Sequence, residues 1–164
     1  MLKPFDERTT EIAAHLNPAL GSLILWEFVN GYETIEAAGP EYPLIFLPMA
    51  LVLHKPTRSL MPPSQTTRLQ MWLSGHPQVR IELDSRVSQL APFVREAFLI
   101  AVSRNMLEIT LDARVASLKK VTPHIRSKQD VEVREIMSKA SLCGKWFAQI
   151  NDATTLFVAF GLRI

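Results

Sequence analysis

One stretch of the chain, residues 47–62, reads Leu47-Pro-Met-Ala-Leu-Val-Leu-His-Lys-Pro-Thr-Arg-Ser-Leu-Met-Pro62. Its first seven residues are apolar enough to be buried, and its prolines interrupt any single regular element. The stretch becomes polar at His54 and carries none of the groups that catalysis needs. Such a segment builds a framework or a docking surface. We expect residues 44–53 to lie in the core and His54, Lys55 and Arg58 to form a candidate docking surface.

Length and composition predict one globular domain. The chain has 164 residues, of which 48% are hydrophobic and 21% are charged. A chain of this size buries about two-thirds of its unfolded surface, so it can form a core without disulfides or metals. We expect a single domain over residues 1–164, made of a core over about 17–120 and a C-terminal helical part over about 127–164.

The single cysteine and the short apolar runs indicate in which cellular compartment the protein is expected. Cys143 cannot form an internal disulfide, which favours a reducing, cytoplasmic setting. The first residues show neither the apolar segment nor the cleavage site of a signal peptide. The longest apolar run, 43–53, has about half of the roughly 20 residues that a membrane-spanning helix needs, and Pro48 interrupts it. We therefore expect no membrane-spanning segment.

Capping residues and apolar spacing predict a mainly α-helical chain. Asn17 followed by Pro18 is typical of a helix start, and Gly39-Pro40 is a helix stop. Apolar residues at helical spacing indicate the other helices. We expect helices over 18–36, 48–54, 65–74, 80–104, from the cap at 127–130 to about 149, and over 153–160, with a short buried strand at 44–47 and a loop at 57–61.

Two short segments late in the chain predict a β-hairpin. Residues 106–111 alternate apolar and polar side chains, and 114–118 follow after a short turn. That turn, Asp112-Ala113, lacks glycine. The order helix, short strand, helix, helix, hairpin is the order of a winged helix. The predicted fold is therefore mainly α with a small β-hairpin, consisting of a winged-helix-like core plus terminal helices.

The residues that usually carry chemistry are scattered. His15, His54, His76 and His124 are far apart and match no metal-binding or triad signature. Gly144-Lys145 lacks the upstream glycine of a phosphate-binding loop, and a tryptophan follows where that loop has a hydroxyl residue. Cys143 falls on the apolar side of a predicted helix, where an inert thiol is expected. We expect a protein that is not an enzyme and that uses no cofactor or metal.

Charge is unevenly distributed along the chain. Residues 1–53 hold two basic and seven acidic side chains, so the remaining 111 residues carry +7. Basic positions gather on and after the hairpin, where the wing of a winged helix contacts DNA phosphates. An acidic partner protein or simple solubility are the alternatives. The candidate contacts with nucleic acid or an acidic partner are Arg104, Arg114, Lys119, Lys120, Arg126 and Lys128, with His124 in the same cluster.

Large apolar side chains offer a second reason to expect partners. Aromatic residues are enriched at the centres of protein interfaces, although each of these residues can equally fill the core. The residues concerned are Trp26, Trp72, Trp146, Leu156, Phe157 and Phe160.

An ordered set of short motifs runs along nearly the whole chain. The motifs are Asn17-Pro-Ala-Leu20, Gly31-Tyr32, Leu47-Pro-Met-Ala-Leu-Val-Leu-His54, Pro56-Thr-Arg58, Leu60-Met-Pro62, Trp72-Leu73, Arg86, Pro92, Arg95-Glu-Ala97, Gly144-Lys-Trp-Phe-Ala148 and Phe160-Gly-Leu-Arg163.

Together these motifs resemble the middle component of bacterial three-component ABC ATPase systems. Such systems combine a small middle protein with an SMC-like ATPase and an effector, and they are related to Lamassu-type antiphage defence. The resemblance implies an accessory subunit without catalytic residues. It would couple an ATPase that senses aberrant or phage DNA ends to an effector such as a nuclease. The hairpin turn departs from the expected pattern, because it is less rich in glycine.

Two other functions remain open from the sequence. A free-standing winged-helix transcriptional regulator would bind duplex DNA, but the predicted helix over 65–74 offers only Gln65, Arg68 and Gln70 as polar readers of bases. An enzyme would need a cleft that brings two histidines together, or a histidine and a carboxylate. Neither arrangement is visible in the sequence.

Overall fold

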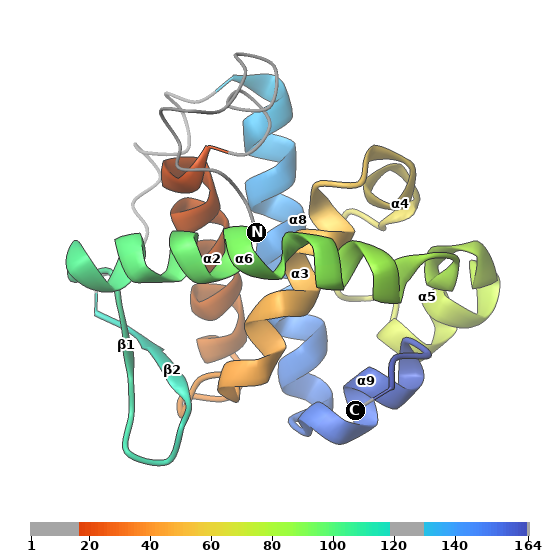
Figure 1. The fold of residues 1–164 in the computed structure, drawn as a ribbon. Helices are drawn as coiled ribbons and strands as arrows, with labels where there is room; N and C mark the ends of the chain where they lie inside the picture. The colour runs from red at the N-terminus through yellow and green to blue at the C-terminus, as the bar shows by residue number, and fades with distance from the viewer. Residues whose placement is uncertain (1–16, 119–129, 164) are drawn as a thin grey trace.

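A computed structural model describes residues 17–118 and 130–163. Within these residues the chain is mainly helical, with one two-stranded antiparallel sheet. Figure 1 shows α2 and α8 standing side by side, α6 crossing in front of them and the hairpin at one edge. The elements are α2 (Pro18–Glu33), η2 (Tyr42–Ile45), α3 (Phe46–Val52), α4 (Lys55–Leu60), α5 (Leu69–Gly75), η3 (Pro77–Arg80), α6 (Leu83–Ser103), β1 (Leu107–Ile109), β2 (Val115–Ser117), α8 (Val131–Ile150) and α9 (Ala153–Ala159).

Helix α2 is the centre of the domain. Its start is as expected: the Asn17 side chain accepts a hydrogen bond from the backbone N–H of Ala19 at 2.9 Å, and Pro18 occupies the first helical position. Most of its side chains are buried, because α8 lies along one side and α6 crosses another. A helix covered on several sides is apolar nearly all round, as α2 is.

Helix α8, expected in the C-terminal part, packs at the centre of the fold against α2. The two backbones touch at a pair of glycines. A Cβ atom on Gly31 would lie 2.3 Å from the carbonyl oxygen of Ser141, and one on Gly144 would lie 2.1 Å from that of Phe28. No side chain fits in these gaps, so glycine at both positions lets the helices approach.

The apolar stretch from 44 to 52 is buried in the core, as expected, but it is helical. The predicted strand at 44–47 is wrong, because η2 and then α3 occupy it. Pro43 lies in the first turn of η2 and Pro48 is the third residue of α3. Proline suits the first turn of a helix, where a backbone N–H needs no partner, and it cannot donate to a strand ladder.

Residues 57–60 are also helical where a loop over 57–61 was predicted. They belong to α4, which His54 caps, in whose first turn Pro56 lies and which Met61 follows in an extended conformation. The same proline rule explains the error: Pro56 begins this helix and does not interrupt it. Helix α5 begins at Leu69 and is shorter than predicted, because Ser64 bonds to Thr66 at 2.7 Å through their hydroxyls and caps no helix.

The hairpin lies where it was predicted, and the long helix predicted over 80–104 begins three residues later, at Leu83, because Arg80 ends η3 and Glu82 adopts a positive φ of 56°. Helix α6 continues through Pro92. Strands β1 and β2 pair with Ile109 opposite Val115. The turn without glycine is possible because Ala113 adopts a positive φ of 59°, while the Thr110 hydroxyl bonds to the Asp112 carboxylate.

A one-residue bridge stands beside the hairpin, on the far side of β2 from β1. Glu41 pairs there with Arg114 in antiparallel fashion. The backbone N–H of Val115 donates to the carbonyl of Pro40 at 2.8 Å, and that of Tyr42 donates to the carbonyl of Ala113 at 3.0 Å. This bridge is the nearest feature to the strand that was expected at 44–47.

The large aromatic side chains fill the core. Trp26, Trp72 and Trp146 are at most 3% exposed, and each of the last two donates its indole N–H to a backbone carbonyl. Phe160 is also buried, and Phe157 is partly buried. The buried residues therefore stabilise the fold, and among the aromatic ones named only Phe157 keeps part of its surface exposed. No helix in the described parts of the chain is long and apolar enough to cross a membrane.

Candidate interaction surface

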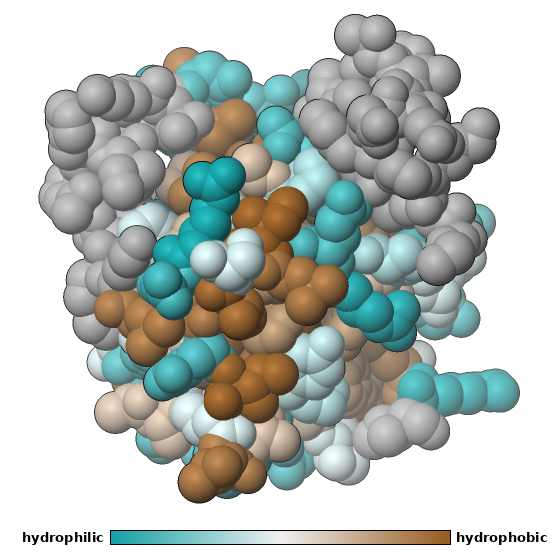
Figure 2. Space-filling model, turned by 60° about the vertical axis from the view of Figure 1, so that its left-hand side comes forward, coloured by the Kyte–Doolittle hydropathy of each residue, from teal (hydrophilic) through white to brown (hydrophobic). Residues whose placement is uncertain are grey.

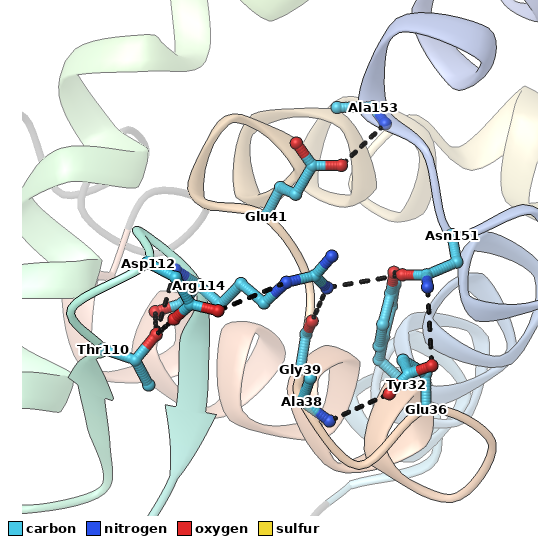
Figure 3. A network of polar contacts seen from close by, with 10 residues as sticks. All are labelled: Tyr32, Glu36, Ala38, Gly39, Glu41, Thr110, Asp112, Arg114, Asn151 and Ala153. Atoms are coloured by element: carbon cyan, nitrogen blue, oxygen red, sulfur yellow. Dashed lines mark hydrogen bonds and ion pairs between the residues drawn. The ribbon is translucent and has the colours of Figure 1, made fainter.

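Arg114, one of the candidate contacts with nucleic acid, points inward and anchors the hairpin. Its guanidinium donates through Nη1 to the carbonyl of Gly39 at 2.6 Å and to the side-chain oxygen of Asn151 at 3.3 Å. Figure 3 shows these bonds joining the hairpin to the loop after α2 and to the junction of α8 and α9. The Arg114 side chain is 20% exposed, and Asp112 approaches its Nε at 3.9 Å.

Asn151 is the centre of this polar network. It ends α8 in the left-handed conformation, with a φ of 51°, which asparagine tolerates better than most residues. Its side-chain oxygen accepts from the Tyr32 hydroxyl at 2.6 Å, and its amide donates to Glu36 at 3.4 Å. Burial raises the pKa of Tyr32 and the Arg114 charge opposes that rise. The network therefore fixes where the hairpin lies.

The predicted basic cluster can be followed only in part. Arg104 lies at the C-terminal end of α6 with an exposed side chain. Arg114 is held in the network described above. The other four candidate contacts and His124 lie outside the residues that the structure describes: Lys119, Lys120, His124, Arg126 and Lys128.

His54, from the predicted docking surface, caps helix α4. Its Nδ1 lies 2.8 Å from the Thr57 hydroxyl and 3.4 Å from the Thr57 backbone N–H, which donates to it. Arg86 donates to the same hydroxyl at 3.5 Å. Burial, and then the nearby Arg86 charge, lower the pKa of His54, while Glu82 opposes the change. The neutral ring is therefore favoured, because only it can accept at Nδ1.

Arg58 is buried, and the expectation that it faces solvent is wrong. Its side chain is 3% exposed and donates through Nη1 to the carbonyl of Val52 and through Nη2 to Glu132, both at 2.7 Å. Glu135 approaches its Nε at 3.6 Å. The charge enters the interior because α8 supplies two carboxylates over it. Of the predicted docking residues, Lys55 is exposed and His54 is half-buried.

Two side chains with potential reactivity, Cys143 and Lys139, are engaged in the fold. Cys143 is fully buried, and burial raises the pKa of its thiol far above the usual value, so the reactive thiolate is disfavoured. Lys139 donates to the carbonyls of Met61 and Pro62, and burial lowers its pKa. Among the described residues, no three His, Cys, Asp or Glu side chains come together as metal ligands would.

Exposed apolar side chains gather on the side of the molecule that carries the hairpin. Figure 2, which brings this side of the molecule forward, shows hydrophobic surface among hydrophilic surface there. Leu99 is 67% exposed, Val102 37% and Ile109 52%, while Leu111 at the hairpin tip is fully exposed. We call these four residues the apolar face. This face was not expected from the sequence, although an apolar residue beside a polar turn, Leu111, indicates apolar exposure. Clustered apolar exposure marks sites of protein contact.

The described part of the molecule also has a groove of about 750 Å³. Its apolar walls come from η2 and α3, from the start of α6 and from the C-terminal residues around α9. Arg95 stands next to it, with its guanidinium carbon 5.5 Å from the centre of the Phe46 ring that lines the groove. No sequence pattern could reveal this groove, because its walls come from segments far apart in the chain.

Comparison with known proteins gives one match. Residues 5–164 match a family model described as ABC-three component (ABC-3C) system Middle Component 3. No curated protein and no solved structure matches the chain.

Proposed function

The chain belongs to the Middle Component 3 family of ABC-three component systems, and from this membership we propose that it is a non-catalytic subunit that links the ATPase of such a system to its effector. The observation that carries the proposal is the extent of the family match, which covers residues 5–164. A match over a single short segment would support a shared fold element, whereas this match includes every helix and strand described above.

The positions of the motif residues support an accessory role. Gly31 and Gly144 bring α2 and α8 into contact, and Arg58 ties α4 to α8. Arg86 donates to the Thr57 hydroxyl in the first turn of α4, and Trp72 packs against Trp146 at 5.0 Å. Each of these motif residues thus holds two elements together. What remains for partners is the surface, where the apolar face offers the kind of area that protein subunits cover.

The identity of the partners belongs to the proposal. The sequence motifs resemble those of systems with an SMC-like ATPase, so we assign that class to the ATPase, a nuclease-type effector to the third component, and Lamassu-related antiphage defence to the whole. A cytoplasmic location follows from these partners. The chain would transmit a change in the ATPase on DNA to the effector.

Co-purification tests the subunit assignment. The chain is co-expressed with the two proteins encoded beside it, one of them tagged, and the complex is isolated in about 0.3 M salt, where exposed charges are largely screened. We expect a complex that contains the chain, and no ATP or nucleic-acid hydrolysis by the chain alone. An unrelated protein of similarly high pI is the control for non-specific binding. If the two neighbours bind each other but neither binds the chain, the proposal is refuted.

A free-standing winged-helix regulator is the second candidate. The bridge at Glu41, on the opposite side of β2 from β1, favours it, since a winged helix has a strand in that place. In this case the isolated chain would bind duplex DNA with a steep salt dependence. Replacing Lys119 and Lys120 by alanine would reduce that dependence, whereas the exposed Arg134 on α8 provides a matched control. Absence of binding at low salt would exclude this function and direct DNA contact.

A further inference from the structure

We propose that two copies of this chain associate face to face, with the hairpin tip of each copy seated in the groove of the other. The inference is independent of the proposed function, because it concerns contacts between identical chains. It rests on three features of the described residues: a rigid apolar tip, an apolar groove of suitable size, and opposite charges beside the two.

The hairpin tip presents a fixed apolar side chain to solvent. Leu111 is fully exposed, yet the turn around it is well ordered by bonds. The Thr110 hydroxyl contacts the Asp112 carboxylate, and the backbone N–H of Thr110 donates to the carbonyl of Arg114 at 2.8 Å. Arg114 is itself tied to the loop after α2. A preorganised tip loses little conformational freedom when it binds, which favours association.

The groove offers apolar walls to such a side chain. It is lined by Pro43, Phe46, Val87, Phe157 and Leu162, and its volume of about 750 Å³ leaves room for more than one side chain. Asp84 and Arg163 are also among its lining residues. In the described chain nothing fills this space, so an apolar occupant would remove both its own surface and that of the walls from water.

One charge next to the tip and one next to the groove are opposite in sign, while the groove lining adds one charge of each sign, Asp84 and Arg163. Asp112 follows Leu111 directly and its side chain is 70% exposed. Its contact with Arg114 is long, at 3.9 Å. Arg95 is exposed beside Phe46 at the groove, and among the described residues it has no ion pair. When Leu111 of one copy enters the groove of the other, the carboxylate and the guanidinium can come within reach. This complementarity selects a second copy as the occupant.

Tyr42 joins the turn of the hairpin to one wall of the groove. Its N–H donates to the carbonyl of Ala113 in the turn, and its ring packs against Phe46, which lines the groove, at 5.8 Å. In the proposed dimer a two-fold axis relates the two contacts, so that the tip of each copy meets the groove of the other. A two-fold arrangement closes as a dimer, whereas a head-to-tail arrangement would continue as a filament.

Sedimentation of the purified chain, without other proteins, tests the proposal. We expect a dimer with a dissociation constant on the order of 10 µM. Leu111→Asp should raise that constant at least about tenfold, since a buried anion would replace an apolar side chain. Arg95→Glu should also weaken the dimer. Met71→Asp, at a 71% exposed position of α5 away from the tip, is the matched control and should leave the dimer unchanged.

Comparison with the variants and with higher concentration distinguishes this arrangement from others. Neither Leu111→Asp nor Arg95→Glu should dimerise at concentrations where the wild type does. A wild type that stays monomeric at about 200 µM, a Leu111→Asp variant that dimerises as the wild type does, or growth into long assemblies would each overturn the proposal. None of these outcomes bears on co-purification with the neighbouring subunits.

Discussion

Adding one methyl group to Gly144 should separate the two central helices and destabilise the protein. A Cβ atom at this position would lie 2.1 Å from the carbonyl oxygen of Phe28 and 2.6 Å from the backbone nitrogen of Tyr32. These two atoms form one hydrogen bond within α2, because a helix pairs residues four apart. The methyl group would therefore lie directly against that bond, and no side-chain rotation can relieve the clash.

The magnitude follows from the missing space. The shorter distance is 1.3 Å below the 3.4 Å of an ordinary contact, so α8 must move away from α2 by about that amount. Overpacking of this kind costs about 1–3 kcal/mol. The clash of Gly144→Ala lies at the upper end of this range, because the new methyl group is fixed to one helix backbone and meets the backbone of the other. The higher helix propensity of alanine offsets about 1 kcal/mol of this cost. The free energy of unfolding should fall by about 2 kcal/mol, which lowers Tm by about 4–8 °C.

Urea denaturation followed by tryptophan fluorescence measures this change. Gly75→Ala is the matched control, because no atom lies within 4 Å of its Cβ position, and it should be neutral or slightly stabilising. Gly31→Ala should resemble Gly144→Ala, since its Cβ would lie 2.3 Å from the carbonyl oxygen of Ser141. The double variant should cost less than the sum, because one separation relieves both clashes. A Gly144→Ala protein within about 0.5 kcal/mol of wild type would refute the reasoning.

Three further predictions concern buried and capping side chains. Burial and the Arg86 charge lower the pKa of His54 below its usual 6.5, so its neutral form stabilises the fold above that pH, and this contribution is lost as the pH falls through the lowered value. Between about pH 7.5 and 5 the wild type should therefore lose stability relative to His54→Asn, as measured by urea denaturation. A difference in stability that stays constant over this range would contradict the prediction. Arg58→Ala should lower the free energy of unfolding by about 2–4 kcal/mol, because a buried carbonyl of α3 loses its partner and a cavity remains. Glu132→Gln, at a 63% exposed side chain, should lower it by less than about 1 kcal/mol. Equal losses for the two variants in urea denaturation would show that the Arg58 side chain is not buried as described. The Cys143 thiol is buried and has a raised pKa, so it should resist alkylation at about pH 8 until the protein unfolds. Mass spectrometry measures the labelling, and rapid labelling of the native protein would show that the thiol is not buried.

Local signals predicted much of the secondary structure. Asn17, Asp130 and Asp152 each accept a backbone hydrogen bond at the start of a helix, as capping residues do. Both strands of the hairpin also lie where the alternating segments placed them. One error came from a proline: Pro56 was expected to mark a loop, whereas it lies in the first turn of α4. Pro48 was expected to begin a helix, and that helix begins two residues earlier, at Phe46. From sequence alone, a proline that begins a helix is difficult to distinguish from one that ends an element.

By itself, then, the sequence determined the helical class, the caps and hairpin, and the family to which the chain belongs. Only the tertiary structure showed that Arg58 is buried, that α8 lies against α2, and that residues from η2, α3, α6 and the C-terminal end line one groove. The physical reason is the separation along the chain between the residues that interact. A cap or an alternating strand depends on neighbours a few residues away, whereas the Arg58 charge is buried by a carboxylate 74 positions further along the chain. Burial and shape arise from such distant pairs, which no local pattern records.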